Sequence, residues 1–346
     1  MAAEFERPYP PGWLDRLTDW IDRMPGPNAL YCLVLLLIQL GWLTALLWLN
    51  GKVPVGTINV RLVFFVVVAP YLLWVRFYLD RVAAAALDAF RSVLAVSEAE
   101  FLRLRYELTT LPARTARIVT SVAVPIFFLN NLLQQTSIAR DFGSSFETAL
   151  IVVGPVGLFT VAVVAVSIVQ AIHQLRMVVR IYELVGKITL FRVRPLYAFS
   201  HLAARTGVSF LLLAYYIAAI RPDLASSVPA LEALLAAMVP TAIACFVLPL
   251  RGMHARLVAE KERALAQVAA RLEAVFVRLH ERVDQETLVD ADKLNAQITS
   301  LSAERAALTG ISTWPWEPAT MTGFLTTLVL PALIWGMQRV LARVGF

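Results

Sequence analysis

Seven long apolar runs divide the chain. A helix of about 20 mostly apolar residues is long enough to cross the hydrocarbon core of a bilayer. The runs that meet this pattern centre on residues 29–49, 62–79, 118–133, 149–175, 206–220, 233–250 and 318–338. The fifth is the shortest, because only 15 uncharged residues separate Arg205 from Arg221. The pattern predicts an all-α integral membrane protein with seven transmembrane helices.

The basic residues between these runs predict which way the chain is threaded. With the N-terminus in the cytoplasm, 25 of the Lys and Arg residues fall in inside segments and 6 in outside segments. Cytoplasmic loops of membrane proteins carry an excess of Lys and Arg. We therefore expect a cytoplasmic N-terminus, an outside C-terminus and a multi-pass protein of the bacterial inner membrane, with the lipid bilayer as its main partner.

Residues 1–27 have the periodicity of an amphipathic helix. The apolar positions recur at helical spacing: Trp13, Leu14, Leu17, Trp20, Ile21 and Met24. Charged residues take the other positions: Asp15, Arg16, Asp19, Asp22 and Arg23. Such a helix lies in the headgroup layer with its apolar face in the lipid. We expect an interfacial helix whose charged residues, Asp15 among them, face water.

The region 28–250 then holds six spans, with cytoplasmic helices predicted at 80–117 and 176–205. Residues 80–95 continue the second apolar run as a helix, and the pattern from Ser97 to Glu100 is a capping box that opens another helix. Pro112 marks where that helix ends. These helices connect two spans, and the sequence assigns them no separate role.

Residues 251–311 are predicted to form a cytoplasmic helical hairpin. Apolar residues repeat there by threes and fours, as in a coiled-coil seam: Leu265, Val268, Leu272, Val275 and Leu279, then Leu294, Ile298 and Leu301. A seam needs a partner helix. The two runs form an antiparallel hairpin within one chain, or the same surface packs between subunits. We favour the hairpin, with its outer face open to an oligomeric bundle.

The seventh span, within residues 312–346, has a stripe of polar and small residues: Thr320, Gly323, Thr327, Pro331 and Gln338. One interpretation is close helix packing through small residues. The other is that threonine hydroxyls and the Gln338 amide line a water-filled path. Trp314 and Trp316 precede this span, and tryptophan favours the headgroup level, so both are predicted interface anchors.

Composition narrows the possible functions. The chain is 59% hydrophobic and 16% charged, which is too apolar for a soluble globule of 346 residues. Its net charge of +6 comes from arginines spread along the chain, which argues against a nucleic-acid partner. Two cysteines and four scattered histidines build neither a disulfide framework nor a metal cluster. Catalytic motifs are missing from the sequence, so we expect neither an enzyme nor a cofactor.

Two resemblances follow from these features. The stretches from Arg105 to Arg114 and from Trp314 to Pro318 look like those of an uncharacterised polytopic membrane family in bacteria. The layout of seven spans, with an inside N-terminus and cytoplasmic extensions on the last helices, resembles the insect gustatory and odorant receptor superfamily. Members of that superfamily are tetrameric cation channels whose last helix lines the pore. The resemblance implies a homo-oligomer, with four as the expected number of subunits, that conducts ions.

The leading functional prediction is therefore an oligomeric ion channel with the seventh span nearest its axis. The alternative is a non-conducting receptor or scaffold whose hairpin binds a partner. An uncoupled small-molecule transporter is the third possibility, because the spans carry few ionisable groups at depth that would couple transport to protons or sodium.

Overall fold

The fold is all-helical. The structure is a computed structural model that describes residues 7–49, 51, 54–58, 60–133, 135, 146–185, 190, 194–220, 229–284 and 291–329. Within these residues the only β pairing is two isolated bridges, Pro11 with Pro112 and Leu94 with Val185. The all-α prediction is confirmed for this part of the chain.

The helices contain the first six apolar runs, and several extend well beyond them. They are α1 (Trp13–Asp22), α2 (Asn28–Leu49), α3 (Val60–Phe90), α4 (Glu98–Thr109), α5 (Ala113–Leu133), α7 (Phe146–Glu183), α8 (Ala198–Ile220), α10 (Pro229–Asp284) and α11 (Ala291–Gly310). Two short 3₁₀ helices, Arg91–Val93 and Arg194–Tyr197, lie between them, and residues 318–329 are again helical.

Among the described residues, five segments are long and apolar enough to cross a membrane. They are Asn28–Leu49, Ala113–Leu133, Val153–Glu183, Pro195–Ile217 and Pro240–Asp284. Helix α3 also begins in an apolar run, but it carries Arg76, Asp80 and Arg81 in its second half. An all-α fold with several membrane-spanning helices fits these observations. The count of seven spans and the orientation remain predictions.

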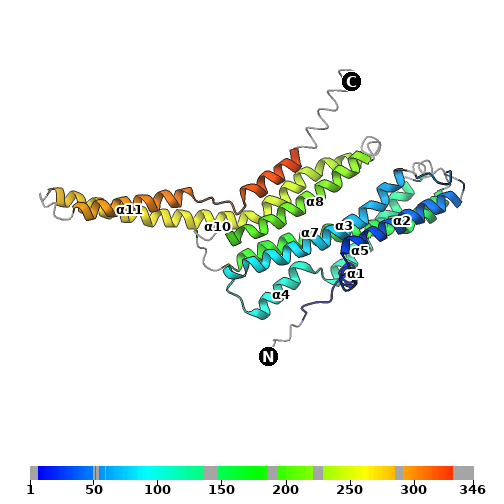
Figure 1. Cartoon of the computed structure of the whole chain (residues 1–346), viewed down its shortest axis with the longest axis horizontal. Coiled ribbons are helices and arrows are strands. Elements are labelled where there is room, and N and C mark those ends of the chain that lie inside the picture. Colours follow the sequence, from blue (N-terminus) through cyan, green and yellow to red (C-terminus); the bar gives the residue numbers. More distant parts are fainter. Residues whose placement is uncertain are drawn as a thin grey trace, which may run out of the picture.

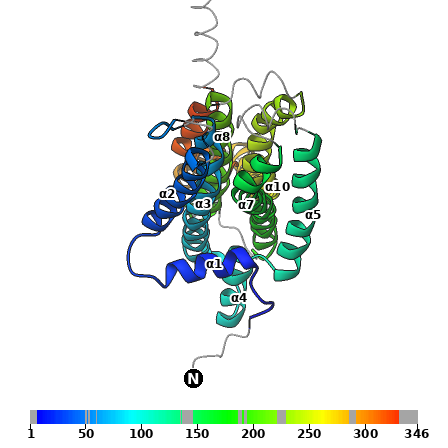
Figure 2. The same cartoon turned by 90° about the vertical axis from the view of Figure 1, so that its right-hand side faces the viewer.

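A bundle of near-parallel helices forms the body of the molecule (Figure 1). Helix α3 packs against α2, α7 and α8, while α8 also packs against α10 and α5 packs against α7. Figure 2 shows α1 running crosswise to these helices, below α2 and α3. Beside it, α4 folds back from the end of α3 and covers part of α7.

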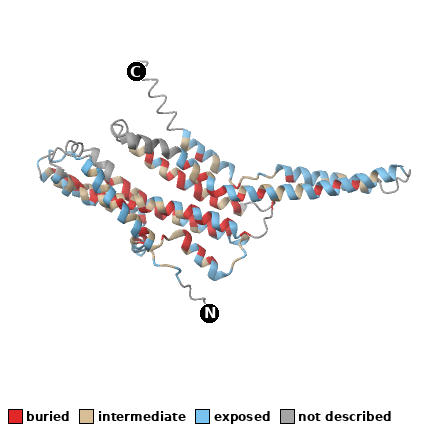
Figure 3. Cartoon of the chain, turned by 180° about the vertical axis from the view of Figure 1, so that it is seen from behind, coloured by how far each residue is buried: buried red, intermediate tan, exposed pale blue. Residues whose placement is uncertain are grey.

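Helix α10 leaves the bundle and continues well beyond it (Figure 1). Its 56 residues correspond to about 84 Å at 1.5 Å per residue, against about 30 Å for the hydrocarbon core of a bilayer. Helix α11 runs back along the projecting half of α10. Figure 3 shows this projection mostly exposed, with a narrow buried stripe between its two helices.

Aromatic residues fill the core where α3, α7 and α8 meet. The rings of Phe90, Tyr182 and Phe199 contact one another edge to face, with centroids 5.1 to 5.6 Å apart. The Tyr182 hydroxyl donates to the Leu196 carbonyl at 3.1 Å, so its polar end is satisfied although the ring is buried. This cluster fixes the spacing of the three helices.

The N-terminal segment is tied to a distant turn, and we call this contact the N-terminal clasp, formed by residues 9–12 and 110–113. The Gly12 amide donates to the Leu111 carbonyl and the Ala113 amide donates to the Pro10 carbonyl, both at 3.0 Å. The Tyr9 hydroxyl donates to the Thr110 carbonyl at 2.8 Å. These bonds hold the start of α1 against the turn between α4 and α5.

Candidate functional site

A buried ion pair joins α1 to α3. The exposed fractions of Asp15 and Arg76 are 5% and 4%, and the Arg76 guanidinium donates directly to the Asp15 carboxylate. That carboxylate also accepts from the Gly12 amide at 3.1 Å and from the Leu111 amide at 3.3 Å. Burial raises the pKa of Asp15, while the guanidinium and the two amides act in the opposite direction. The prediction that Asp15 faces water was wrong.

The close approach of α1 to α5 depends on a glycine. A Cβ at Gly12 would lie 2.9 Å from the Ala116 Cβ and 2.9 Å from the Asp15 carboxylate. Only glycine, which has no side chain, fits at this distance. The close approach brings the Gly12 amide within reach of the carboxylate that pairs with Arg76. The glycine therefore helps to build the ion pair.

Polar residues of α7 complete the surroundings of this pair. The side chains of Gln170, His173 and Gln174 share one face of α7 and meet the last turn of α4. They lie 3.2, 2.8 and 3.4 Å from the carbonyls of Thr109, Glu107 and Leu108, respectively. The final carbonyls of a helix have no partner within the helix itself. The α7 side chains supply those partners and fix α4 beside the ion pair.

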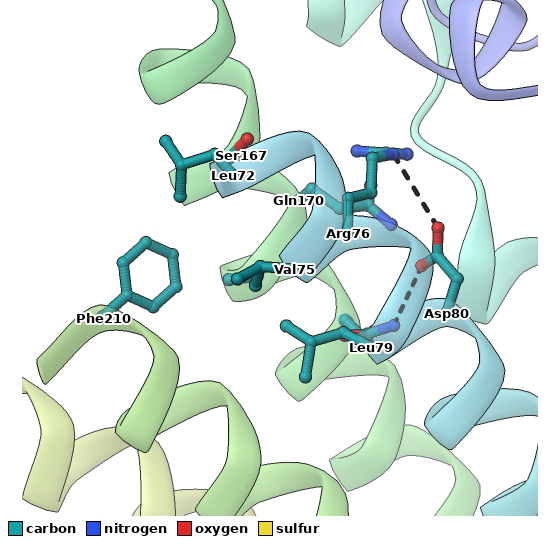
Figure 4. A pocket seen from close by; sticks show the side chains of 10 residues that line it. Leu72, Val75, Arg76, Leu79, Asp80, Ser167, Gln170 and Phe210 are labelled. Atoms are coloured by element: carbon teal, nitrogen blue, oxygen red, sulfur yellow. Dashed lines mark hydrogen bonds and ion pairs between the residues drawn. The ribbon is translucent and has the colours of Figure 1, made fainter. Parts of the chain in front are cut away.

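A cavity lies next to Arg76, between α3, α7 and α8 (Figure 4). About 20 Å³ of it is open to the centres of water molecules. Asp80 lies one turn after Arg76, with 3.8 Å between its carboxylate and the Arg76 Nε, and the Gln174 amide is 3.5 Å from the same carboxylate. Leu72, Val75, Leu79 and Phe210 form the apolar walls. Three polar residues of α3 and α7 are buried beside it: Arg76, Gln170 and Gln174.

The sequence pattern did not single out this site, because Arg76 falls near the end of the second apolar run, 62–79. The available signal was the Arg76–Asp80 pair, one helical turn apart at the end of an apolar run. Ionisable residues at such positions are functional candidates by default. Their partner Asp15, however, lies 61 residues away in the chain.

A second feature is a ladder of stacked rings that joins α10 to residues 312–329. His254 stacks on Trp314 with centroids 3.9 Å apart, and Trp314 stacks on Trp316 at 4.3 Å. Trp316 stacks on Phe246 at 5.4 Å, and Phe246 on Phe324 at 4.6 Å. Trp314 and Trp316, predicted as membrane anchors, thus lie in a ring stack against α10.

The predicted pore residues take different positions on the helical stretch 318–329. The Thr320 hydroxyl faces α8, 2.9 Å from the His201 Nδ1. Gly323 is exposed, with nothing within 4 Å of an added Cβ, and Thr327 is half-buried. Pro331 and Gln338 lie outside the described residues. From Thr320 onwards the exposed residues of this stretch are Thr322, Gly323, Leu325, Thr326 and Val329, so of the described residues of the predicted stripe only Gly323 lies on the exposed face.

The predicted seam residues line the contact between α10 and α11. Val268, Leu272 and Val275 are buried, while Leu265 and Leu279 are half-buried. From α11, Leu294, Ile298 and Leu301 are half-buried and Leu308 is buried. Lys261 donates to the carbonyls of Thr309 and Ile311 at 2.7 and 2.8 Å, which closes the end of α11. In this structure the two runs pack against each other within one chain.

The described residues contain no group of three or more His, Cys, Asp and Glu side chains that could hold a metal ion. No protein-family model, curated protein or solved structure matches the chain. The two resemblances noted in the sequence therefore remain predictions. The geometry of the described residues is what bears on function.

Proposed function

We propose that the chain is a subunit of an oligomeric ion channel in which the helix beginning at residue 318 lies nearest the axis. The observation that carries this proposal is that the helical stretch 318–329 is held from one side only. Phe324 is buried against Phe246, and the Tyr215 hydroxyl donates to the Leu328 carbonyl at 3.1 Å. The opposite face has no cover from the described part of the chain.

That open face combines the small or hydroxyl-bearing Thr322, Gly323 and Thr326 with the apolar Leu325 and Val329, and all five are exposed. The Thr322 and Thr326 hydroxyls donate to the carbonyls four residues earlier, at 3.0 and 2.9 Å. Each hydroxyl hydrogen is therefore used within the helix, which leaves oxygen lone pairs available on the exposed side. A row of such acceptors suits a water-filled cation path, and the small residues suit close packing of neighbouring copies.

The test is conductance from the purified protein in liposomes, in a background in which Cys32 and Cys245 are replaced by alanine. We expect currents, and we expect a charged thiol reagent to abolish most of the current of Thr326→Cys. The matched control is Ile126→Cys, an exposed position on α5, where the reagent should have no effect. Absence of current at all voltages and in all common salts, or equal block at both positions, contradicts the proposal.

Subunit number gives an independent check. The proposal requires several copies around one axis, and four is the number expected from the resemblance. Single-particle images of the detergent-solubilised protein give this number directly. A monomer would contradict the channel even if weak leakage were recorded.

A second candidate function, a non-conducting receptor or scaffold, is favoured by the surface of the α10–α11 projection. Phe276, Val277 and Val283 are exposed there, and they provide apolar contacts for another protein. Phe276→Asp with Val277→Asp tests it, with Gln267→Asp as a control for added charge on the same helix. Loss of self-association supports the channel, whereas intact self-association with loss of a different partner supports the scaffold. Leu272→Asp and Ile298→Asp are less suitable, because both side chains lie in the internal seam.

A further inference from the structure

The cavity beside Arg76 contains hydrogen-bonding atoms that the described part of the chain leaves unpaired. They are Arg76 Nε and Nη1, Ser167 Oγ and Gln170 Oε1, and all four are buried. Arg76 and Gln170 are each at least 95% buried. Figure 4 shows these three side chains, from α3 and α7, around the space that Leu72 and Val75 also line. Buried polar groups in native proteins are almost always paired, so the cavity needs a polar occupant.

The charges around the cavity decide what kind of occupant it takes. The Arg76 guanidinium already faces two carboxylates, those of Asp15 and Asp80. Those two carboxylates oppose an additional anion, while a cation cannot accept hydrogen bonds from the unpaired donors of Arg76. A neutral molecule meets neither penalty. The unpaired atoms include donors from Arg76 and an acceptor from Gln170, so the occupant must both accept and donate hydrogen bonds.

The size of the cavity selects water. A water molecule needs roughly 10 to 15 Å³ of volume measured for its centre, and the cavity offers about 20 Å³. Among neutral molecules that both accept and donate hydrogen bonds, water matches this volume best. The hydroxyl of Ser167 accepts or donates as its neighbour requires, so it matches either orientation of the water.

We propose that this cavity is a built water site, in which a bound water accepts from Arg76 and donates to Gln170 or Ser167. The water completes the hydrogen bonds of a guanidinium that otherwise has unpaired donors inside the bundle. It also keeps the Arg76 side chain oriented so that its Nη2 reaches Asp15. Three helices, α1, α3 and α7, are then joined through one arginine and one water. This inference is independent of the channel proposal.

Hydroxyl-radical footprinting with a short X-ray pulse tests the site, because a bound water generates radicals that oxidise the side chains next to it. Leu72 and Leu87 form a matched pair on α3, exposed by 2% and 0%. Leu72 lines the cavity, whereas Leu87 lies in the main hydrophobic core. We expect oxidation of Leu72 well above that of Leu87 in the full-length protein. Equal protection of both residues would overturn the proposal.

Ser167→Val provides the second arm, because it removes the hydroxyl and fills the space. Oxidation of Leu72 should fall to the level of Leu87 in this variant, while Leu87 stays protected and so reports that the fold is intact. Unchanged oxidation of Leu72 in a folded Ser167→Val protein means that the radicals come from elsewhere and overturns the proposal. If Leu87 becomes oxidised, the variant has unfolded, and the wild-type comparison decides the question.

Discussion

Two helical segments are attached to the bundle in different ways. Helix α1 is attached through a buried ion pair between Asp15 and Arg76, whereas residues 312–329 are attached through the ring ladder from His254 to Phe324. An ion pair whose carboxylate also accepts from two backbone amides, here those of Gly12 and Leu111, has one favourable geometry. Stacked rings keep much of their contact when they slide over one another. Helix α1 is therefore fixed in position, while residues 312–329 are attached in a manner that permits small shifts.

Removing the charge at Arg76 should cause the largest loss of folding stability. In Arg76→Met the Asp15 carboxylate stays buried without its partner, which typically costs about 3 to 5 kcal/mol. We expect a large drop in the thermal unfolding temperature in detergent. Arg81→Met is the control on the same helix, because its 3.9 Å pair with Asp22 is exposed on both sides and such pairs contribute about 0 to 1 kcal/mol. Similar losses of stability for both variants would show that the buried pair stabilises the fold no more than the exposed pair does.

Gly12→Ala should have the next largest effect. The added methyl group would meet Ala116 at 2.9 Å, and overpacking of this kind costs about 1 to 3 kcal/mol. Gly252→Ala is the matched control, because nothing lies within 4 Å of that position in α10. The control should be neutral or slightly stabilising, since alanine is the better helix former. Unfolding measurements that rank the two variants in the opposite order would refute the close approach of α1.

The ring ladder should tolerate substitution better than the ion pair. Trp314→Leu removes two stacked contacts, with His254 and Trp316, for a loss of about 1 to 2 kcal/mol. The near-ultraviolet circular dichroism band from the coupled tryptophans should also disappear. Trp20→Leu, at an exposed position in α1, should change neither quantity much. A loss as large as that of Arg76→Met would remove the contrast between the two attachments.

The smallest effect is expected at the end of the projecting hairpin. Lys261→Met removes the hydrogen bonds to the Thr309 and Ile311 carbonyls, at a cost of about 1 kcal/mol. Faster hydrogen exchange should be confined to the last turn of α11. In Arg263→Met, which removes only an exposed pair with Glu260, exchange there should stay as in the parent. Faster exchange throughout the bundle of Lys261→Met would contradict a local role.

The helices were predictable from the sequence because their signals are local. An apolar run of sufficient length placed α2 and α5 within a few residues, and the Ser97 cap was recognised from the pattern that ends at Glu100. Ser97 does accept a hydrogen bond from the Glu100 amide, at 3.3 Å. These features depend on neighbours within one or two helical turns.

The candidate sites were less predictable because their partners are far apart in the chain. Trp314 and Trp316 were singled out in the sequence. Their stacking on His254 and Phe246, respectively, depends on how α10 packs against residues 312–317. The sequence grouped Thr320, Gly323 and Thr327 on one stripe, whereas in the structure Thr320 faces α8 and Gly323 is exposed. Both faces of that short stretch carry threonines and small residues, so periodicity alone could not decide which one packs on α8. Asp15 was misplaced for a similar reason, since an amphipathic pattern does not reveal a buried arginine on another helix.

The N-terminal clasp has a consequence for how the protein is made. Tyr9 and Pro10 leave the ribosome about a hundred residues before the turn at Thr110 that they bind. At roughly 5 to 20 residues per second this interval lasts about 5 to 20 seconds. During synthesis the apolar side of α1 must be covered by another surface, such as the bilayer. Helix α1 reaches its final position only after the start of α5 has left the ribosome. Helix α1 is therefore made before α4 and the start of α5 but reaches its final position only together with them.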